Sequence, residues 1–282
     1  MSAAGRLLDA RFTRRRILRA SLLTVTLVYV GVLLIAPLAG IIYGTVRAGL
    51  SVVGETFSQP DVRHAYWLSA IIAVITIAVT TVLGVITSWV LTRHRFLGRG
   101  FLNALVDLPM AVSPVIVELM AVLLFGRGGW FEPFFAARGI QIIFALPSMV
   151  IVTIFICIPF VIREVVPVLE EVGVDEEEAA KTLGANSLQT FFKVMLPNIK
   201  WALLYGVALT TARALGEIGA VLIVSGSLQG QTETATLYIF RALEERQDAS
   251  SFVVALSLAA ISILLLIAIE TFKRRQQKEA GK

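Results

Sequence analysis

The sequence predicts an all-α integral membrane protein with six transmembrane helices. Hydrophobic residues make up 57% of the 282 positions and charged residues only 16%, which lies outside the usual balance of soluble domains. A bilayer core about 30 Å thick needs about 20 apolar residues per helix. Runs of that kind recur six times along the chain. The basic residues gather at the ends of these runs, so the net charge of +5 reflects membrane topology and not nucleic-acid binding.

The six apolar runs also divide the chain into segments. By hydropathy the spans cover residues 20–46, 66–91, 101–125, 140–162, 201–224 and 252–269. We expect residues 1–19 to form a cytoplasmic segment and residues 20–62 to form the first transmembrane helix with its external loop. A transmembrane domain would then occupy residues 63–271, and a basic cytoplasmic tail residues 272–282.

The distribution of Lys and Arg predicts the orientation of these spans. With a cytoplasmic N-terminus, 18 of the 25 Lys and Arg residues lie in the inside segments and six in the outside loops, while Arg213 lies within a span. Inside loops of membrane proteins carry an excess of positive charge. We therefore expect a multi-pass protein with both termini in the cytoplasm.

The longest predicted cytoplasmic segment, residues 163–200, has helical patterning of its own, which lies within a loop of residues 170–200. Asp175 can act as an N-cap with Glu178 as its capping-box partner, and Gly184 is placed to end this short helix in a left-handed conformation. A second helix can start at Asn186, with Gln189 as the reciprocal partner. Pro197 is expected to end or redirect it. The sequence thus predicts two short capped helices at the membrane face.

This segment resembles the EAA loop of binding-protein-dependent ABC importer permeases. The resemblance rests on Glu178-Ala179-Ala180, Gly184 and Leu196-Pro197 and their spacing. It implies the type I (MetI-like) permease fold with a cytoplasmic coupling helix, which seats in a cleft of a separate ATPase and converts nucleotide-driven closure into movement of the spans. The residues that the resemblance assigns to this coupling are Asp175, Glu178, Ala179, Ala180, Gly184, Leu196 and Pro197.

Longer stretches resemble the sulfate/thiosulfate permeases of the CysW type. They are residues 107–115, 158–164, 197–206 and 213–220. The resemblance implies import of sulfate or thiosulfate by a complex in a bacterial-type inner membrane. Its other members would be a second homologous permease, two copies of an ATPase and an extracytoplasmic sulfate-binding protein. Molybdate and tungstate permeases share the Leu215-Gly216-Glu217 element and are the alternative.

The chain carries no phosphate-binding loop of the Gly-x-x-x-x-Gly-Lys-Ser/Thr type. ATP and Mg²⁺ would therefore be bound by the partner ATPase, and we expect no catalytic residues, cofactor or metal on this chain. A membrane-embedded enzyme would need convergent catalytic groups in the spans, which the sequence does not supply. A carrier driven by an ion gradient would not need a coupling loop of this spacing.

Ionisable residues inside the predicted spans are candidates for an anion path. Arg213 and Glu217 are four residues apart in the fifth span, where a charge is costly unless it is paired or faces water. They can form an ion pair that fixes helix packing. Alternatively, Arg213 compensates the charge of a passing dianion, with Glu217 limiting how tightly the anion is held.

The third predicted span contains two prolines, Pro109 and Pro114, which free backbone carbonyls. The sequence predicts a kink near Ser113, which either faces a cavity or is purely structural. In a straight helix Asp107 and Glu118 would share one face of this span.

Overall fold

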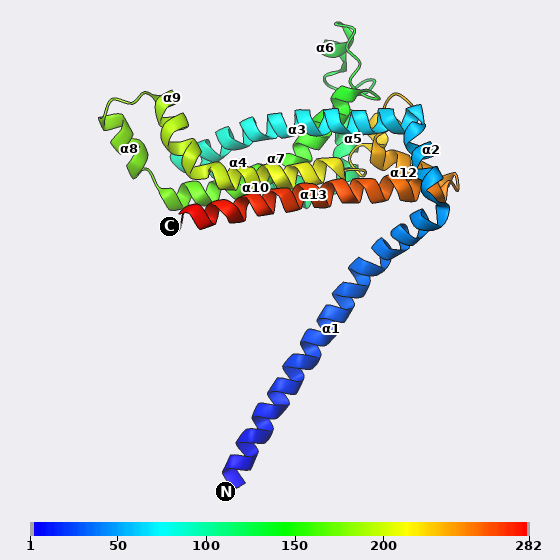
Figure 1. Ribbon diagram of the computed structural model, residues 1–282. Coiled ribbons are helices and arrows are strands. Elements are labelled where there is room, and N and C mark those ends of the chain that lie inside the picture. Colours follow the sequence, from blue (N-terminus) through cyan, green and yellow to red (C-terminus); the bar gives the residue numbers. More distant parts are fainter. Residues whose placement is uncertain (1–2, 281–282) are drawn as a thin grey trace.

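The computed structural model describes residues 3–280 and is helical throughout, with side chains described for residues 20–49, 51–268 and 271. Figure 1 shows its elements. In chain order they are α1 (Ala3–Ala48), α2 (Leu50–Ser58), α3 (Pro60–Arg93), α4 (Arg99–Ala111), α5 (Pro114–Phe125), α6 (Glu132–Ala136), α7 (Leu146–Val172), α8 (Asp175–Thr182), α9 (Ser187–Thr190), the π-helical turn η1 (Phe191–Met195), α10 (Leu196–Leu215), α11 (Leu222–Ser225), α12 (Ala235–Glu244) and α13 (Asp248–Ala280).

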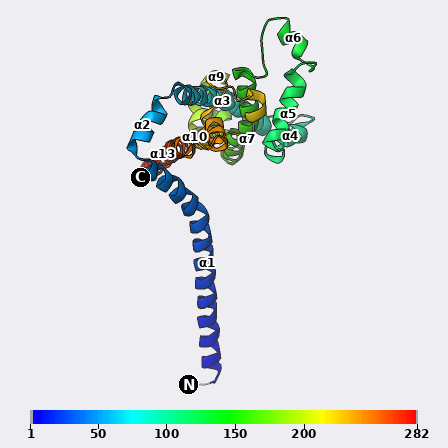
Figure 2. The same ribbon diagram turned by 90° about the vertical axis from the view of Figure 1, so that its right-hand side faces the viewer.

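Four helices form the bundle. α7 packs against α3 and α10, and α13 packs against the other side of α10. α8 and α9 lie at one end of this bundle and α2 and α12 at the other, while α1 leaves the bundle as a long isolated helix (Figures 1 and 2). The C-terminal end of α1 packs on α13, where Gly44 faces the ring of Phe252.

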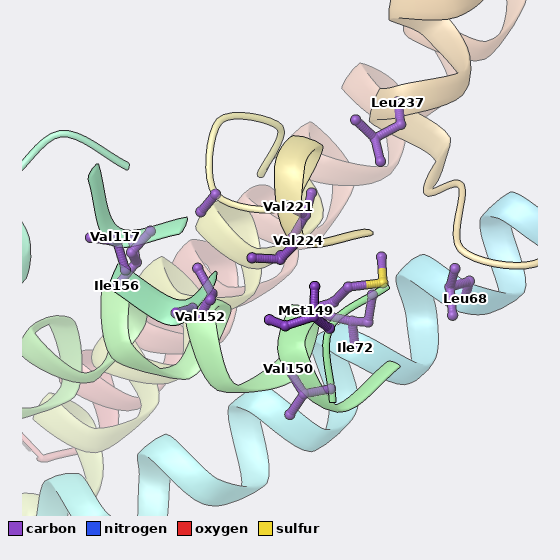
Figure 3. Packing of buried hydrophobic residues seen from close by; sticks show 13 residues of the cluster. Leu68, Ile72, Val117, Met149, Val150, Val152, Ile156, Val221, Val224 and Leu237 are labelled. Carbon is purple, nitrogen blue, oxygen red and sulfur yellow. The ribbon is translucent and has the colours of Figure 1, made fainter. Parts of the chain in front are cut away.

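The bundle core combines apolar packing with close backbone approach. Its largest cluster joins α3, α5, α7 and α11, with Met149 and Val152 of α7 at the centre (Figure 3). Farther along α7, Val161 lies between two glycines. A Cβ on Gly84 of α3 would lie 2.6 Å from a Val161 methyl carbon, and a Cβ on Gly206 of α10 would lie 2.9 Å from the Val161 Cα. Small residues at these positions let the three helices touch.

Among the residues that the structure describes, four helices are long and apolar enough to cross a membrane. They are residues Ala20–Ala48 within α1, Pro60–Arg93 (α3), Leu146–Val172 (α7) and Asp248–Ala268 within α13. These correspond to the first, second, fourth and sixth predicted spans. α7, however, begins at Leu146 and not at residue 140, because Pro147 occupies its first turn, where proline is favoured.

The third predicted span is two helices and not one. α4 and α5 meet at an angle of 112°, so the expected kink near Ser113 is a complete break. Val112 and Ser113 both have extended backbone, and Pro114 is the first residue of α5. A proline disfavours helical backbone at the residue before it, which explains why the break falls at Ser113. Asp107 and Glu118 therefore do not share a face of one helix.

The fifth predicted span also differs. α10 ends at Leu215, and irregular backbone with the short α11 follows, whereas hydropathy predicted a span over residues 201–224. Arg213 lies in the last turn of α10, and Glu217 lies beyond its end. The apolar run is real, but part of it packs as a turn against α5 and α7.

The contact between α7 and α10 predicts the effect of one added methyl group. Gly206→Ala would place its Cβ against the backbone of Val161, so the two helices must separate, and overpacking of this kind costs about 1–3 kcal/mol. Thermal unfolding of the detergent-solubilised protein, followed by circular dichroism, should show a lower midpoint. Gly40→Ala is the matched control, since no described atom lies within 4 Å of that position. Equal midpoints for both variants would contradict the close approach.

Candidate functional site

The α8–α9 segment (residues 173–195) leads from the end of α7 into α10. α8 is eight residues long, which is about two helical turns. The predicted capping box on Asp175 and Glu178 is wrong, because the Val174 carbonyl accepts the Glu178 amide at 2.9 Å and Asp175 is already the first helical residue. The four acidic residues 175–178 fill the first turn, where the positive end of the helix dipole favours them.

The turn between α8 and α9 has the predicted geometry. Gly184 has φ +86°, and the Ala185 amide donates to the Ala180 carbonyl at 3.0 Å, which closes a left-handed helix end. The capping box on Asn186 is confirmed. Its side-chain oxygen accepts the Gln189 amide at 2.8 Å, and the Gln189 side chain accepts the Asn186 amide at 2.9 Å. Local sequence therefore determines this turn.

Pro197 does not end the second helix, although the chain does change direction between α9 and α10, as Figure 1 shows. α9 continues through the π-helical turn η1 into α10, and Pro197 lies in the first turn of α10. A proline inside a helix lacks an N–H and its ring collides with the carbonyl four residues earlier. The wider π turn over residues 191–195 accommodates it, as such turns do at helix irregularities. Leu196 packs beside the buried Met195 and Ile199 and joins the segment to the core.

One face of α8 points away from the bundle. Glu178, Ala179 and Thr182 are exposed, and Leu183 at the helix end is 88% exposed. The exposed face thus combines a carboxylate, a small residue and an unpartnered apolar side chain.

The other face of α8 is attached to the bundle by polar side chains. Arg93, the last residue of α3, donates to the Glu177 carboxylate at 2.9 Å and also to the carbonyls of Leu169 and Gly173 at the end of α7. The Asn198 amide of α10 donates to Glu176 at 2.6 Å. The sequence analysis assigned no role to Arg93 or Asn198. A basic residue in the last turn of α3 was the available signal.

Arg213 and Glu217 form the ion pair that the sequence suggested, at 2.8 Å, although the carboxylate is outside the helix. The Glu217 side chain is 3% exposed and the Arg213 side chain 35%. The other Glu217 oxygen accepts the Ala220 amide at 2.8 Å, and the Glu217 backbone carbonyl accepts the Thr236 hydroxyl. Glu217 therefore fixes the turn after α10, while Arg213 remains accessible.

The break between α4 and α5 lies against this turn. A Cβ on Gly219 would lie 3.5 Å from the Pro114 Cβ, so Ser113, the N-cap of α5, is close to the chain that carries Glu217. One turn farther along α5, the fully buried Glu118 accepts the amides of Ile223 and Val224 at the start of α11. The break between α4 and α5 and the irregular backbone after α10 thus lie against each other, and Arg213, Glu217 and Glu118 lie beside them.

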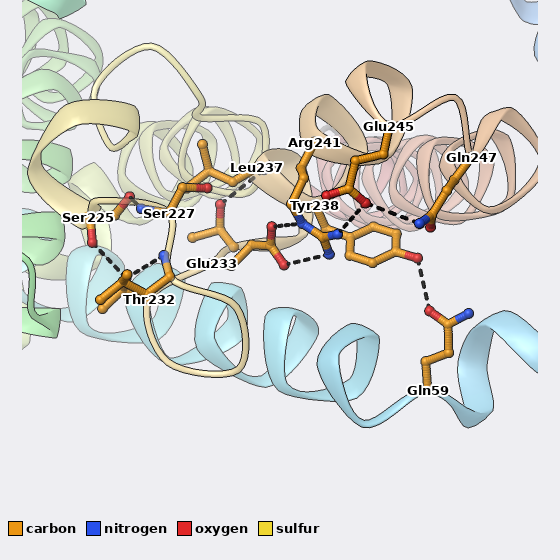
Figure 4. A network of polar contacts seen from close by, with 12 residues as sticks. Gln59, Ser225, Ser227, Thr232, Glu233, Leu237, Tyr238, Arg241, Glu245 and Gln247 are labelled. Carbon is orange, nitrogen blue, oxygen red and sulfur yellow. Dashed lines mark hydrogen bonds and ion pairs between the residues drawn. The ribbon is translucent and has the colours of Figure 1, made fainter.

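Further ion pairs brace the fold. Arg163 of α7 pairs with Asp107 of α4 at 2.6 Å. At the end of the bundle that carries α12, Arg241 binds the buried Glu233 through two nitrogens, at 2.6 and 3.1 Å, and also pairs with Glu245 (Figure 4). Hydrogen bonding to Glu233 raises the pKa of Arg241, so this group stays charged. The Arg163–Asp107 pair joins residues 56 positions apart in the sequence, whereas Arg241 and Glu233 are only eight apart.

Among the residues that the structure describes, no three His, Cys, Asp or Glu side chains gather as a metal site. Apolar helices, a helix broken in mid-span and an exposed short helix outside the bundle define the class of this protein. It is a helical, membrane-embedded protein.

The chain belongs to the family described as binding-protein-dependent transport system inner membrane component, whose model matches residues 81–278. It is 44% identical to the sulfate transport system permease protein CysW of Synechococcus elongatus, covering 90% of this chain and 88% of that one. It is 37% identical to the permease protein CysT of Salmonella typhimurium, covering 89% and 90%.

A solved bacterial alginate ABC transporter, in complex with an alginate-bound periplasmic protein, has the same fold. Its matching chain superimposes with a TM-score of 0.78 at 15% identity, covering 95% of this chain and 98% of that one. The type I ABC permease fold expected from the resemblance is thus confirmed.

The capping box of α9 predicts a local effect of one substitution. Asn186→Ala removes the acceptor of the Gln189 amide, and loss of such a cap costs about 1 kcal/mol. Hydrogen exchange at that amide should become about fivefold faster. Asn186→Ser, which keeps a capping oxygen, should exchange nearly as the parent does. Unchanged exchange in Asn186→Ala would contradict the capped geometry.

Proposed function

We propose that this chain is the permease subunit of an ATP-driven importer that moves sulfate or thiosulfate into the cytoplasm. The observation that carries the proposal is similarity over nearly the whole length to proteins named as sulfate transport permeases, at 42–44% identity for several CysW proteins. Import of molybdate or tungstate is the alternative, because permeases for these oxyanions share the Leu215-Gly216-Glu217 element.

The α8–α9 segment is proposed as the coupling segment, within residues 170–200. Glu178 and Ala179 lie on the exposed face of α8, and Ala180 and Gly184 shape the turn that follows. Asp175 adds charge at the exposed start of α8, while Leu196 and Pro197 begin α10. A stiff, capped element with a small-residue surface suits transmission of force from an ATPase.

In the proposed topology the chain crosses the membrane six times. α4 and α5 together form one broken span, and α10, 20 residues long, is another, in a transmembrane domain of residues 63–271. Both termini are then cytoplasmic, as the distribution of Lys and Arg requires. The N-terminal segment 1–19 and the tail 272–282 would flank that domain on the cytoplasmic side.

The proposed complex contains a second homologous permease, two copies of an ATPase that binds ATP and Mg²⁺, and an extracytoplasmic sulfate-binding protein. Similarity to both CysW and CysT proteins supports a pair of homologous permeases. The family description and the periplasmic protein bound to the alginate transporter support a binding protein. α1, whose apolar window is 0% buried, is left to membrane lipid and the partner permease.

The anion path is proposed to pass Arg213. This guanidinium is the accessible member of its ion pair, and the start of α5 at Ser113 lies against the same turn. The cavity around Glu217 holds only about 10 Å³, so the carboxylate acts by positioning the turn and Arg213 and not by contacting the anion. A helix N-terminus and an arginine are both favourable to a dianion.

Substrate competition tests the transport function. In proteoliposomes that contain the complete complex, uptake of radiolabelled sulfate should require ATP and should be inhibited by unlabelled sulfate and thiosulfate. Molybdate should compete weakly. Competition by molybdate alone would replace the sulfate assignment, and uptake without the ATPase would exclude the importer function.

If Arg213 lines the anion path, removing its charge should reduce transport but leave assembly of the complex intact. In Arg213→Gln combined with Glu217→Gln the pair is neutral, so no buried charge is left unpaired. We expect this variant to assemble and its sulfate uptake to fall by at least about tenfold. Arg213→Lys, which keeps the charge, should retain part of the uptake. Full uptake in the neutral variant would show that the pair serves packing alone.

A further inference from the structure

Arg93 is the contact between three elements at the end of the bundle that carries α8. It is the last residue of α3, and its side chain is only 8% exposed. Its Nε and Nη2 lie 2.9 Å from a Glu177 oxygen of α8, its Nη1 donates to the Leu169 carbonyl at 3.0 Å, and its Nη2 donates to the Gly173 carbonyl at 2.6 Å. The two carbonyls belong to the last turn and the C-cap of α7.

An arginine is required by the arrangement of these acceptors. Three groups surround the guanidinium in different directions, and a planar group with five N–H donors can serve them together. A lysine ammonium is a single point charge and reaches fewer of them at once. The carbonyls at the end of α7 have no partner within their own helix, so Arg93 also satisfies that helix end.

Apolar packing contributes little to holding α8. None of its eight residues, all of which the structure describes, is buried. Beside the Arg93–Glu177 pair lies a cavity of about 260 Å³, lined by Val85, Ile86 and Trp89 of α3 and by Leu188, Phe191 and Met195. The apolar contact between Val85 and Met195 belongs to the residues after α8 and not to α8 itself. The link between α3 and α8 is therefore polar, and Arg93 makes it.

A second, weaker contact attaches α8 to α10. Asn198 donates to Glu176 at 2.6 Å, at an exposed position and without a charge on the donor. Glu176 and Glu177 are neighbours, so α8 is held between α10 on one side and α3 and α7 on the other. The buried, charged contact of Arg93 is the stronger of the two.

We propose that Arg93 is the positioning residue through which displacement of α8 moves α3 and α7 together. The inference rests on the proposed coupling function of the α8–α9 segment and adds the element that transmits it. Arg93 does not contact the anion or the ATPase in this proposal. It keeps α8 in a fixed position relative to two helices of the bundle, so a push on α8 displaces the helices and not α8 alone.

The test uses the complete complex in proteoliposomes, with sulfate uptake and ATP hydrolysis measured side by side. Arg93→Ala should assemble and hydrolyse ATP at its basal rate, but uptake per ATP hydrolysed should fall at least tenfold. Arg93→Lys should be intermediate, and Glu177→Gln should show a smaller loss. Adding Glu177→Gln to Arg93→Ala should change nothing further. Arg95→Ala, an exposed arginine two residues later, is the matched control and should couple normally.

A cross-link separates this inference from the coupling function itself. Cysteine placed by Ala179→Cys should cross-link to the ATPase in the parent complex and in Arg93→Ala. If it fails to do so in the parent, the coupling assignment of α8 is wrong. If it cross-links in both while Arg93→Ala and Glu177→Gln transport with the parent ratio of uptake to ATP hydrolysis, the role of Arg93 is overturned. Should Arg93→Ala fail to assemble, a normal ratio in Glu177→Gln and Arg93→Lys would overturn it equally.

Discussion

In a membrane, backbone amides and carbonyls that leave the regular helix must find partners inside the protein, because lipid offers none. This chain breaks its helices at Ser113 and again after Leu215, and buried carboxylates provide the partners. Glu118 accepts two amides at the start of α11, and Glu217 accepts the Ala220 amide. The backbone between α10 and α12 can leave the regular helix because these carboxylates accept its amides.

The same constraint explains why two broken stretches lie together. α5 carries Glu118 to the amides of α11 only because the break at Ser113 turns α5 by 112° from α4. Apolar contacts of Val117 with Val221 and Val224 then support the position that the hydrogen bonds define. The break between α4 and α5 and the turn after α10 thus form one structural unit. α10 connects the α8–α9 segment to this unit.

Sequence reasoning succeeded where local chemistry decides the structure. Hydropathy located the apolar runs, Gly184 and Asn186 indicated the turn between α8 and α9, and Pro114 indicated a kink near Ser113, where the structure has a complete break. It failed where distant residues decide. Asp175 is not a cap, because Val174 is the N-cap and Asp175 is the first helical residue. Its neighbours Glu176 and Glu177 bind Asn198 and Arg93. Glu217 lies outside a helix because it caps a turn that packs on α5.

Pro197 shows how such a failure connects to function. A proline rule predicts a stop, yet the π turn before Pro197 allows α9 to continue, with a change of direction, into α10, so the backbone from Ser187 to Leu215 stays helical. This continuity connects the α8–α9 segment with Arg213, which lies in the last turn of that same α10. Under the proposed coupling function, a movement of the α8–α9 segment would reach Arg213 through α10, while Arg93 would carry it to α3 and α7. Arg213 adjoins the irregular backbone that Glu118 and Glu217 hold by accepting its amides, so the same helix that begins at the proposed coupling segment ends at the proposed anion path.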